Sequence, residues 1–80
     1  MRTDEETLRL FDESYPKFKW FIEEYFNPKL ITLLEFTRET KNVDALLTIL
    51  NGVWFYLPDN KFNIIENPKG WTEFLDIIED

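Results

Sequence analysis

Few side chains in this 80-residue sequence could perform covalent chemistry. It contains no histidine and no cysteine, and Ser14 is its only serine. A nucleophile of the serine or cysteine hydrolase type would therefore lack its base, and disulfides and thiolate metal sites are excluded. Glu35 and Glu39 lie four residues apart and could share a helix face for acid–base work, but such pairs are usually solvated. We expect no enzymatic activity and no cofactor.

One segment carries the oxygen ligands that hard cations prefer. Residues 59–63 begin like a calcium-binding loop, but the sixth loop position holds Ile64 instead of glycine and the twelfth holds Gly70 instead of an acid. The chain has only two glycines, which is too few for a glycine-rich phosphate-binding loop. We therefore expect neither a metal nor a nucleotide.

The charge balance bears on the kind of partner. Sixteen Asp and Glu residues against nine Lys and Arg residues give a net charge of −7. Such a chain repels phosphate backbones, so we do not expect direct binding to nucleic acid. The longest apolar run, residues 53–57, is too short to span a membrane, and residues 3–6 are polar where a signal peptide would be apolar. Together with the absence of cysteine, this predicts a cytoplasmic protein with no membrane contact.

The acids concentrate at the two ends of the chain. Residues 1–14 hold five acids and two bases, and residues 58–80 hold six acids and two bases. Part of this excess follows from helix formation, because acids such as Asp4 and Glu5 stabilise a helix N-terminus. If the two ends meet in space they form one acidic face, which would steer a basic protein towards it.

Helical periodicity dominates the first half of the chain. Thr3 and Glu6 form a capping-box pattern that predicts a helix from about residue 4 to 14, which Pro16 ends or kinks. A second helix is expected over about 18–26, where apolar residues recur at helical spacing. The third, over about 28–40, is apolar nearly all round, which is typical of the central and most buried helix of a domain.

The second half leaves alternatives open. Asn42 can cap a helix over about 43–50, but Asn51-Gly52 is also a strong hairpin signal, and Gly52 could instead end the helix. Residues 53–65 are therefore either helix plus loop or a short β-hairpin. Asn67-Pro68 predicts a last helix with an apolar stripe from Trp71 to Ile78. The predicted fold is mainly α, a single domain over residues 1–80 with four to five short helices; α+β is the alternative.

Aromatic side chains are more abundant than a small core requires. They make up 18% of the chain, and Trp20 lies off the apolar stripe of its predicted helix. The five consecutive apolar residues 53–57 cannot all face inward, because neighbours on a helix point about 100° apart. Tryptophan and tyrosine bury a large area at binding interfaces for little lost entropy. We therefore expect part of the aromatic surface to be exposed and to contact a partner.

A local resemblance points the same way. Residues 42–46 together with Leu50, Gly52, Tyr56 and Pro58 resemble the helix and following segment of the barstar family of ribonuclease inhibitors. That family is small and acidic and blocks a basic nuclease with helix carboxylates and aromatic side chains, so the resemblance implies a binding role for Asp44. The sequence departs from the family at Thr48, where a second binding acid is expected, and in lacking the opening strand.

Taken together, these features predict a small acidic protein-binding domain, a stoichiometric inhibitor of a more basic protein. Immunity proteins, antitoxins and phage anti-defence proteins are of this kind. The side chains expected to contact the partner are aromatic residues and terminal or loop acids: Trp20, Phe55, Tyr56, Asp59, Trp71, Asp4, Glu5, Glu79 and Asp80. The alternative is a structural or assembly subunit that forms homo-oligomers through its aromatic surface.

Overall fold

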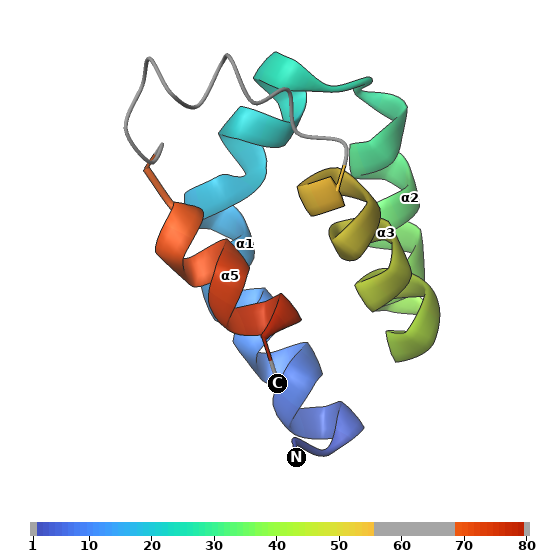
Figure 1. Ribbon diagram of the computed structural model, residues 1–80. Coiled ribbons are helices and arrows are strands. Elements are labelled where there is room, and N and C mark those ends of the chain that lie inside the picture. The colour runs from blue at the N-terminus through green and yellow to red at the C-terminus, as the bar shows by residue number, and fades with distance from the viewer. Residues whose placement is uncertain (1, 56–68, 80) are drawn as a thin grey trace.

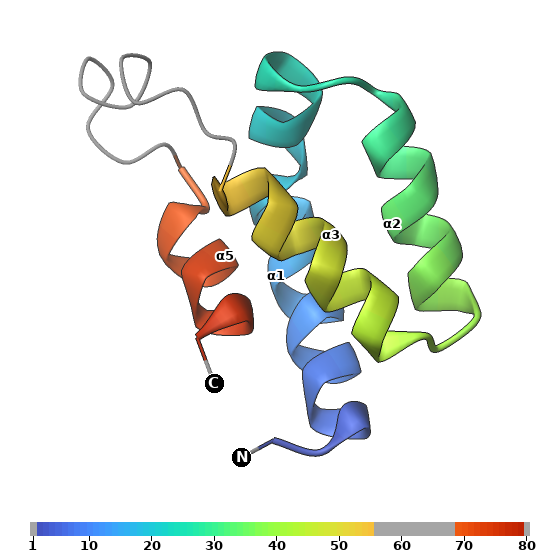
Figure 2. The same cartoon turned by 45° about the vertical axis from the view of Figure 1, so that its right-hand side comes forward.

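The computed structural model describes residues 2–55 and 69–79, which contain four α-helices and no strand. The helices are α1 (Asp4–Tyr25), α2 (Lys29–Glu39), α3 (Val43–Phe55) and α5 (Trp71–Ile78). α1 runs the length of the molecule and packs against the other three, while α3 also contacts both α2 and α5 (Figures 1 and 2). The predicted mainly α fold is confirmed.

The two helices expected before residue 27 form a single helix, so the predicted break at Pro16 is wrong. A proline inside a helix removes one hydrogen bond and costs about 3 kcal/mol. The buried or half-buried side chains of α1 continue across it at alternating spacings of three and four: Leu8, Phe11, Tyr15, Phe18 and Ile22. Because each fully buried side chain of this size contributes about 1.5–3 kcal/mol, one continuous buried stripe outweighs the proline.

The predicted caps of α1 and α3 are confirmed. The Thr3 hydroxyl accepts a hydrogen bond from the Glu6 backbone N–H at 3.2 Å, and the Glu6 carboxylate accepts one from the Thr3 N–H at 3.3 Å. The Asn42 side chain accepts a hydrogen bond from the Ala45 N–H at 3.2 Å. These caps satisfy backbone donors that the first turn of a helix leaves without partners.

The expectation that the third helix is the central one is wrong. α1 takes the central position, and α2 buries only Leu34 and Thr37 completely. Among the described helices α2 contacts only α1 and α3, and two of its apolar side chains face solvent. Leu33 and Phe36 are 49% and 61% exposed.

α3 continues through the ambiguous region as far as Phe55, so neither a turn at Asn51-Gly52 nor a helix end at Gly52 is correct. Asn51 donates a side-chain hydrogen bond to the Leu47 carbonyl at 2.8 Å, as a residue inside a helix can. Of the hairpin proposed for residues 53–65, the first three residues belong to α3, and residues 56–65 lie outside the described ranges.

α5 packs against α1 through aromatic rings. Phe74 contacts Phe18 edge-on at a centroid distance of 5.4 Å and Phe21 at 5.5 Å, and it stacks on Trp71 at 5.3 Å. The close approach begins at Gly70, whose φ of +89° is left-handed. A Cβ atom there would lie 2.2 Å from the Lys17 carbonyl oxygen, so glycine is required.

Candidate functional site

A groove between α3 and α5 brings an exposed tryptophan beside an acidic side chain. It has a volume of about 280 Å³ and is lined by Asn51 and Trp54 from α3 and by Leu75, Ile78 and Glu79 from α5 and its C-terminal end. We call these five residues the α3–α5 groove. Trp54 is 49% exposed, although it lies one residue after the buried Val53.

The sequence of α3 explains why Trp54 lies in this groove. Val43, Leu46, Leu50 and Val53 form the buried stripe, and Trp54 lies about 100° further round the helix from Val53, on the side of α5. Phe55 follows another 100° on and is 72% exposed. Two consecutive large aromatic side chains therefore reach the surface at the end of one helix.

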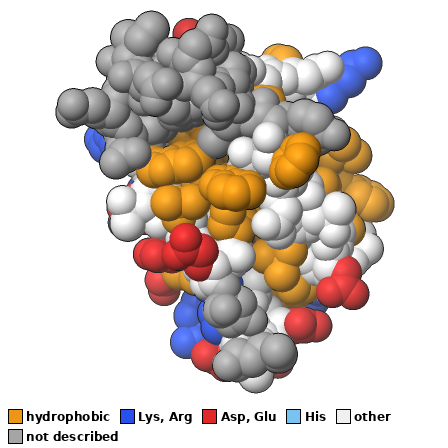
Figure 3. All heavy atoms as spheres, in the orientation of Figure 1, with side chains coloured by type: hydrophobic (Ala, Val, Ile, Leu, Met, Phe, Trp, Pro, Cys, Tyr) orange, Lys and Arg blue, Asp and Glu red, His pale blue; other side chains and the backbone are white. Residues whose placement is uncertain are grey.

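Acidic side chains are present on both helices of the groove. Figure 3 shows hydrophobic side chains gathered over α3 and α5, with acidic side chains towards the end of the molecule that holds both chain ends. Asp76 and Glu79 are exposed on α5 and its C-cap, and Asp44 is exposed in the first turn of α3. The arrangement combines apolar anchors with negative charge.

The two ends of the described chain lie close together (Figures 1 and 2). The Arg2 guanidinium donates hydrogen bonds to the backbone carbonyls of Asp76, at 2.8 Å, and Ile77. α5 has no basic residue in its own last turn, so Arg2 provides the positive charge that a helix C-terminus favours. Asp4 and Glu5 nevertheless line a different hollow from Glu79.

Two of the predicted contact residues take part in internal packing. The Trp20 indole is 40% exposed, and its N–H donates to the Lys69 carbonyl at 2.8 Å, which ties α1 to the start of α5. Trp71 is half-buried and packs against Phe21 and Phe74. Of the other predicted contacts, Tyr56, Asp59 and Asp80 lie outside the described residues.

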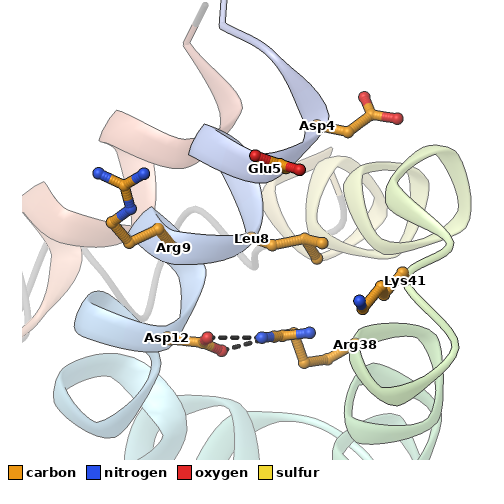
Figure 4. A pocket seen from close by; sticks show the side chains of 7 residues that line it. All are labelled: Asp4, Glu5, Leu8, Arg9, Asp12, Arg38 and Lys41. Carbon is orange, nitrogen blue, oxygen red and sulfur yellow. Dashed lines mark hydrogen bonds and ion pairs between the residues drawn. The ribbon is translucent and has the colours of Figure 1, made fainter.

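Asp4 and Glu5 belong to a charged hollow of about 480 Å³ between α1 and the end of α2 (Figure 4). Across it, Arg38 binds Asp12 through two hydrogen bonds of 2.6 and 2.7 Å. These hydrogen bonds lower the pKa of the Asp12 carboxyl and raise the pKa of Arg38. Because the hollow mixes carboxylates with Arg9, Arg38 and Lys41, it has no single charge preference.

A second polar contact joins α1 to α2. The Tyr15 hydroxyl donates a hydrogen bond to the Glu35 carboxylate at 3.0 Å, and Lys19 lies 3.6 Å from the same oxygen. Burial of the phenol and its bond to Glu35 raise the pKa of Tyr15. Glu35 is thus part of the α1–α2 interface, and it lines a hollow of about 370 Å³ together with Glu39.

Sequence reasoning missed Trp54, Leu33 and Phe36 as surface residues. Trp54 continues the helical spacing of Leu46, Leu47 and Leu50, which is typical of a buried stripe, and Leu33 and Phe36 lie on the helix that was expected at the centre. One signal was present for Trp54, because it directly follows Val53, which lies closer to the stripe of Leu46 and Leu50.

Residues 2–55 and 69–79 bring no three Asp, Glu, His or Cys side chains together as a metal site. No helix in these ranges is both long enough and apolar enough to cross a membrane.

Comparisons of the chain with protein-family models, with curated proteins and with solved structures found no match. The local resemblance of residues 42–58 to the barstar family therefore has no support from these comparisons. No family is assigned.

Proposed function

We propose that this domain is a stoichiometric inhibitor that binds a more basic protein through the α3–α5 groove and the adjoining Phe55. The observation that carries the proposal is the exposure of the consecutive residues Trp54 and Phe55, 49% and 72%, with Glu79 lining the same groove as Trp54. Exposed tryptophan next to acidic residues is suited to a partner that presents apolar and basic side chains together.

The binding energy requires both the exposed aromatic side chains and the negative charge. Burying the exposed parts of two aromatic side chains removes about 200 Å² from water, which is worth about 5 kcal/mol. Micromolar affinity requires about 8 kcal/mol after the entropic cost of association. The aromatic pair therefore acts as an anchor, and charge attraction and further contacts supply the remainder. The surplus negative charge of the chain also speeds encounter with a basic partner.

A matched pair of variants tests this proposal. Trp54 and Leu33 have the same exposed fraction, 49%, but lie on different faces. The wild-type chain, Trp54→Ser and Leu33→Ser would be used as bait in lysate of the cells that express it, with circular dichroism confirming that each variant is folded. We expect the wild type and Leu33→Ser to capture a basic protein in a one-to-one ratio. Trp54→Ser should lose this capture, and added salt should weaken it. Equal capture by all three, or loss with Leu33→Ser alone, would contradict the proposal.

A second candidate function is self-assembly through the outer face of α2. Leu33 and Phe36 lie three residues apart and are both exposed, and the two acids of α2 are balanced by Lys29 and Arg38. This neutral face is the part of an acidic molecule that a second copy could approach with least repulsion. Sedimentation equilibrium tests it: a dimer dissociated by Phe36→Glu but not by Trp54→Ser supports the second function, and a wild-type monomer excludes it.

A further inference from the structure

We propose that the α3–α5 groove is a receptor for an arginine side chain of the partner. The inference rests on the proposed function and specifies which chemical group the groove recognises. Its volume of about 280 Å³ lies below the usual range for drug-sized ligands, about 300–1,000 Å³, and suits one long side chain.

The lining of the groove matches the parts of an arginine side chain. Leu75 and Ile78 provide apolar surface for the three methylene groups, which arginine buries while its charged end stays near solvent. The Trp54 ring provides a face on which a planar guanidinium can stack. Glu79 provides a carboxylate, to which a guanidinium can donate two parallel hydrogen bonds.

These groups are not occupied by other parts of the described chain. Trp54 has no ring contact, hydrogen bond or cation contact there, in contrast to Trp20, whose N–H is bonded to Lys69. Glu79 has no ion pair within the same ranges, whereas Glu35 and Glu73 each have a lysine within 4.0 Å. Asn51 uses its amide N–H₂ towards the Leu47 carbonyl and keeps its side-chain oxygen as a further acceptor.

The electrostatics of the groove also favour a cation. It lies at the C-terminal end of α5, where the carbonyl ends of the helix carry partial negative charge. The Glu79 backbone N–H binds the Leu75 carbonyl, and Arg2 binds those of Asp76 and Ile77. Arg2 therefore offsets part of the negative charge of this helix end, and the Glu79 carboxylate is the charged group that lines the groove and attracts a cation into it.

The test uses small probes and needs no partner. The ¹⁵N-labelled chain would be titrated with N-acetyl-arginine amide and with N-acetyl-citrulline amide, which has nearly the same shape but no charge. We expect saturable millimolar shifts at the Trp54 indole N–H and at the amides of Asn51 and Glu79, with citrulline at least about fivefold weaker. The Trp54 signal is identified by its absence in Trp54→Phe, and Glu79→Gln should abolish the preference for arginine.

Several results would overturn the inference. These are equal shifts with citrulline, shifts centred on the Trp20 indole, or no saturation at any site. The outcome is separable from that of the capture experiment. If Trp54→Ser abolishes capture but the arginine probe leaves the groove unaffected, the arginine inference fails and the proposed function stands. If the probe occupies the groove but no basic protein is captured, the proposed function fails.

Discussion

The two glycines of the chain make a stringent test of the fold that forms the groove, because the same substitution should have opposite effects at the two positions. At Gly70 an alanine must adopt a φ near +89°, which costs about 1–2 kcal/mol for a residue with a Cβ atom. Its Cβ would also lie 2.2 Å from the Lys17 carbonyl oxygen and 2.9 Å from the Phe18 Cα. Both are backbone atoms of α1, so α5 must move away, at a further cost of about 1–3 kcal/mol.

Gly52 is the matched control. It lies inside α3, and apart from its chain neighbours and the backbone of its own helix an added Cβ would meet no described heavy atom within 4 Å. Alanine is about 1 kcal/mol better than glycine inside a helix. Gly52→Ala should therefore stabilise the domain by about 0.5–1 kcal/mol, while Gly70→Ala destabilises it by about 3–4 kcal/mol.

Thermal and urea unfolding followed by circular dichroism measure both effects. For a domain of this size, 1 kcal/mol shifts the melting temperature by about 4–8 °C, so Gly70→Ala should melt about 15–25 °C lower and Gly52→Ala slightly higher. Gly70→Asn separates the two costs at that position, because asparagine tolerates positive φ but keeps the Cβ atom. We expect it to remain within about 1 kcal/mol of Gly70→Ala. Near-wild-type stability of either Gly70 variant would refute the described packing of α5 on α1. Destabilisation by Gly52→Ala would instead contradict the continuous helix α3 at that position.

Three further predictions concern polar contacts. Arg2→Ala should lower the free energy of unfolding by about 1–2 kcal/mol, because it removes the contact with α5. The control Arg9→Ala, which removes an exposed arginine, should change it by no more than about 0.5 kcal/mol. Equal effects of the two substitutions would contradict the Arg2 contact. Because Arg38 lowers the pKa of Asp12, their pairing stabilises the fold above the unfolded-state pKa, about 3.9, and is lost as pH falls below it. Asp12→Asn should thus lower stability by up to about 1 kcal/mol at pH 7 and by less at pH 3, and a loss independent of pH would argue against this pairing. Trp20→Phe should cost about 1 kcal/mol in urea unfolding through its lost hydrogen bond, and an unchanged midpoint would exclude that role.

Local rules predicted most of the helical architecture. The capping box at Thr3, the cap at Asn42 and the spacing of apolar residues located the helix starts because these signals act within one or two turns. The effect of Pro16 on the helix could not be predicted from such local signals. Its local cost is offset by burial along the whole of α1, and that burial depends on α5, which is more than fifty residues away in sequence.

The candidate site was less accessible to sequence reasoning. Phe55 was correctly expected at the surface, but Trp54 fits the periodicity of a buried stripe and its exposure depends on how closely α5 approaches α3. Phe36 was placed in the core because its helix is apolar on all sides, and only the position of the neighbouring helices shows which side is covered. Periodicity therefore identifies the helices but does not determine which of their apolar sides are covered by another helix.

The most direct test of the central claim, that the α3–α5 surface contacts a basic protein, is photocrosslinking in the cell. The photoreactive amino acid p-benzoylphenylalanine would replace Phe55, which is 72% exposed, and in a separate chain would replace Leu33 on α2 as the control. We predict one discrete adduct from position 55, between the chain and a protein of basic isoelectric point, that is absent from position 33 and reduced by Glu79→Lys. An adduct of twice the chain's own mass, or equal crosslinking from both positions, would contradict the account.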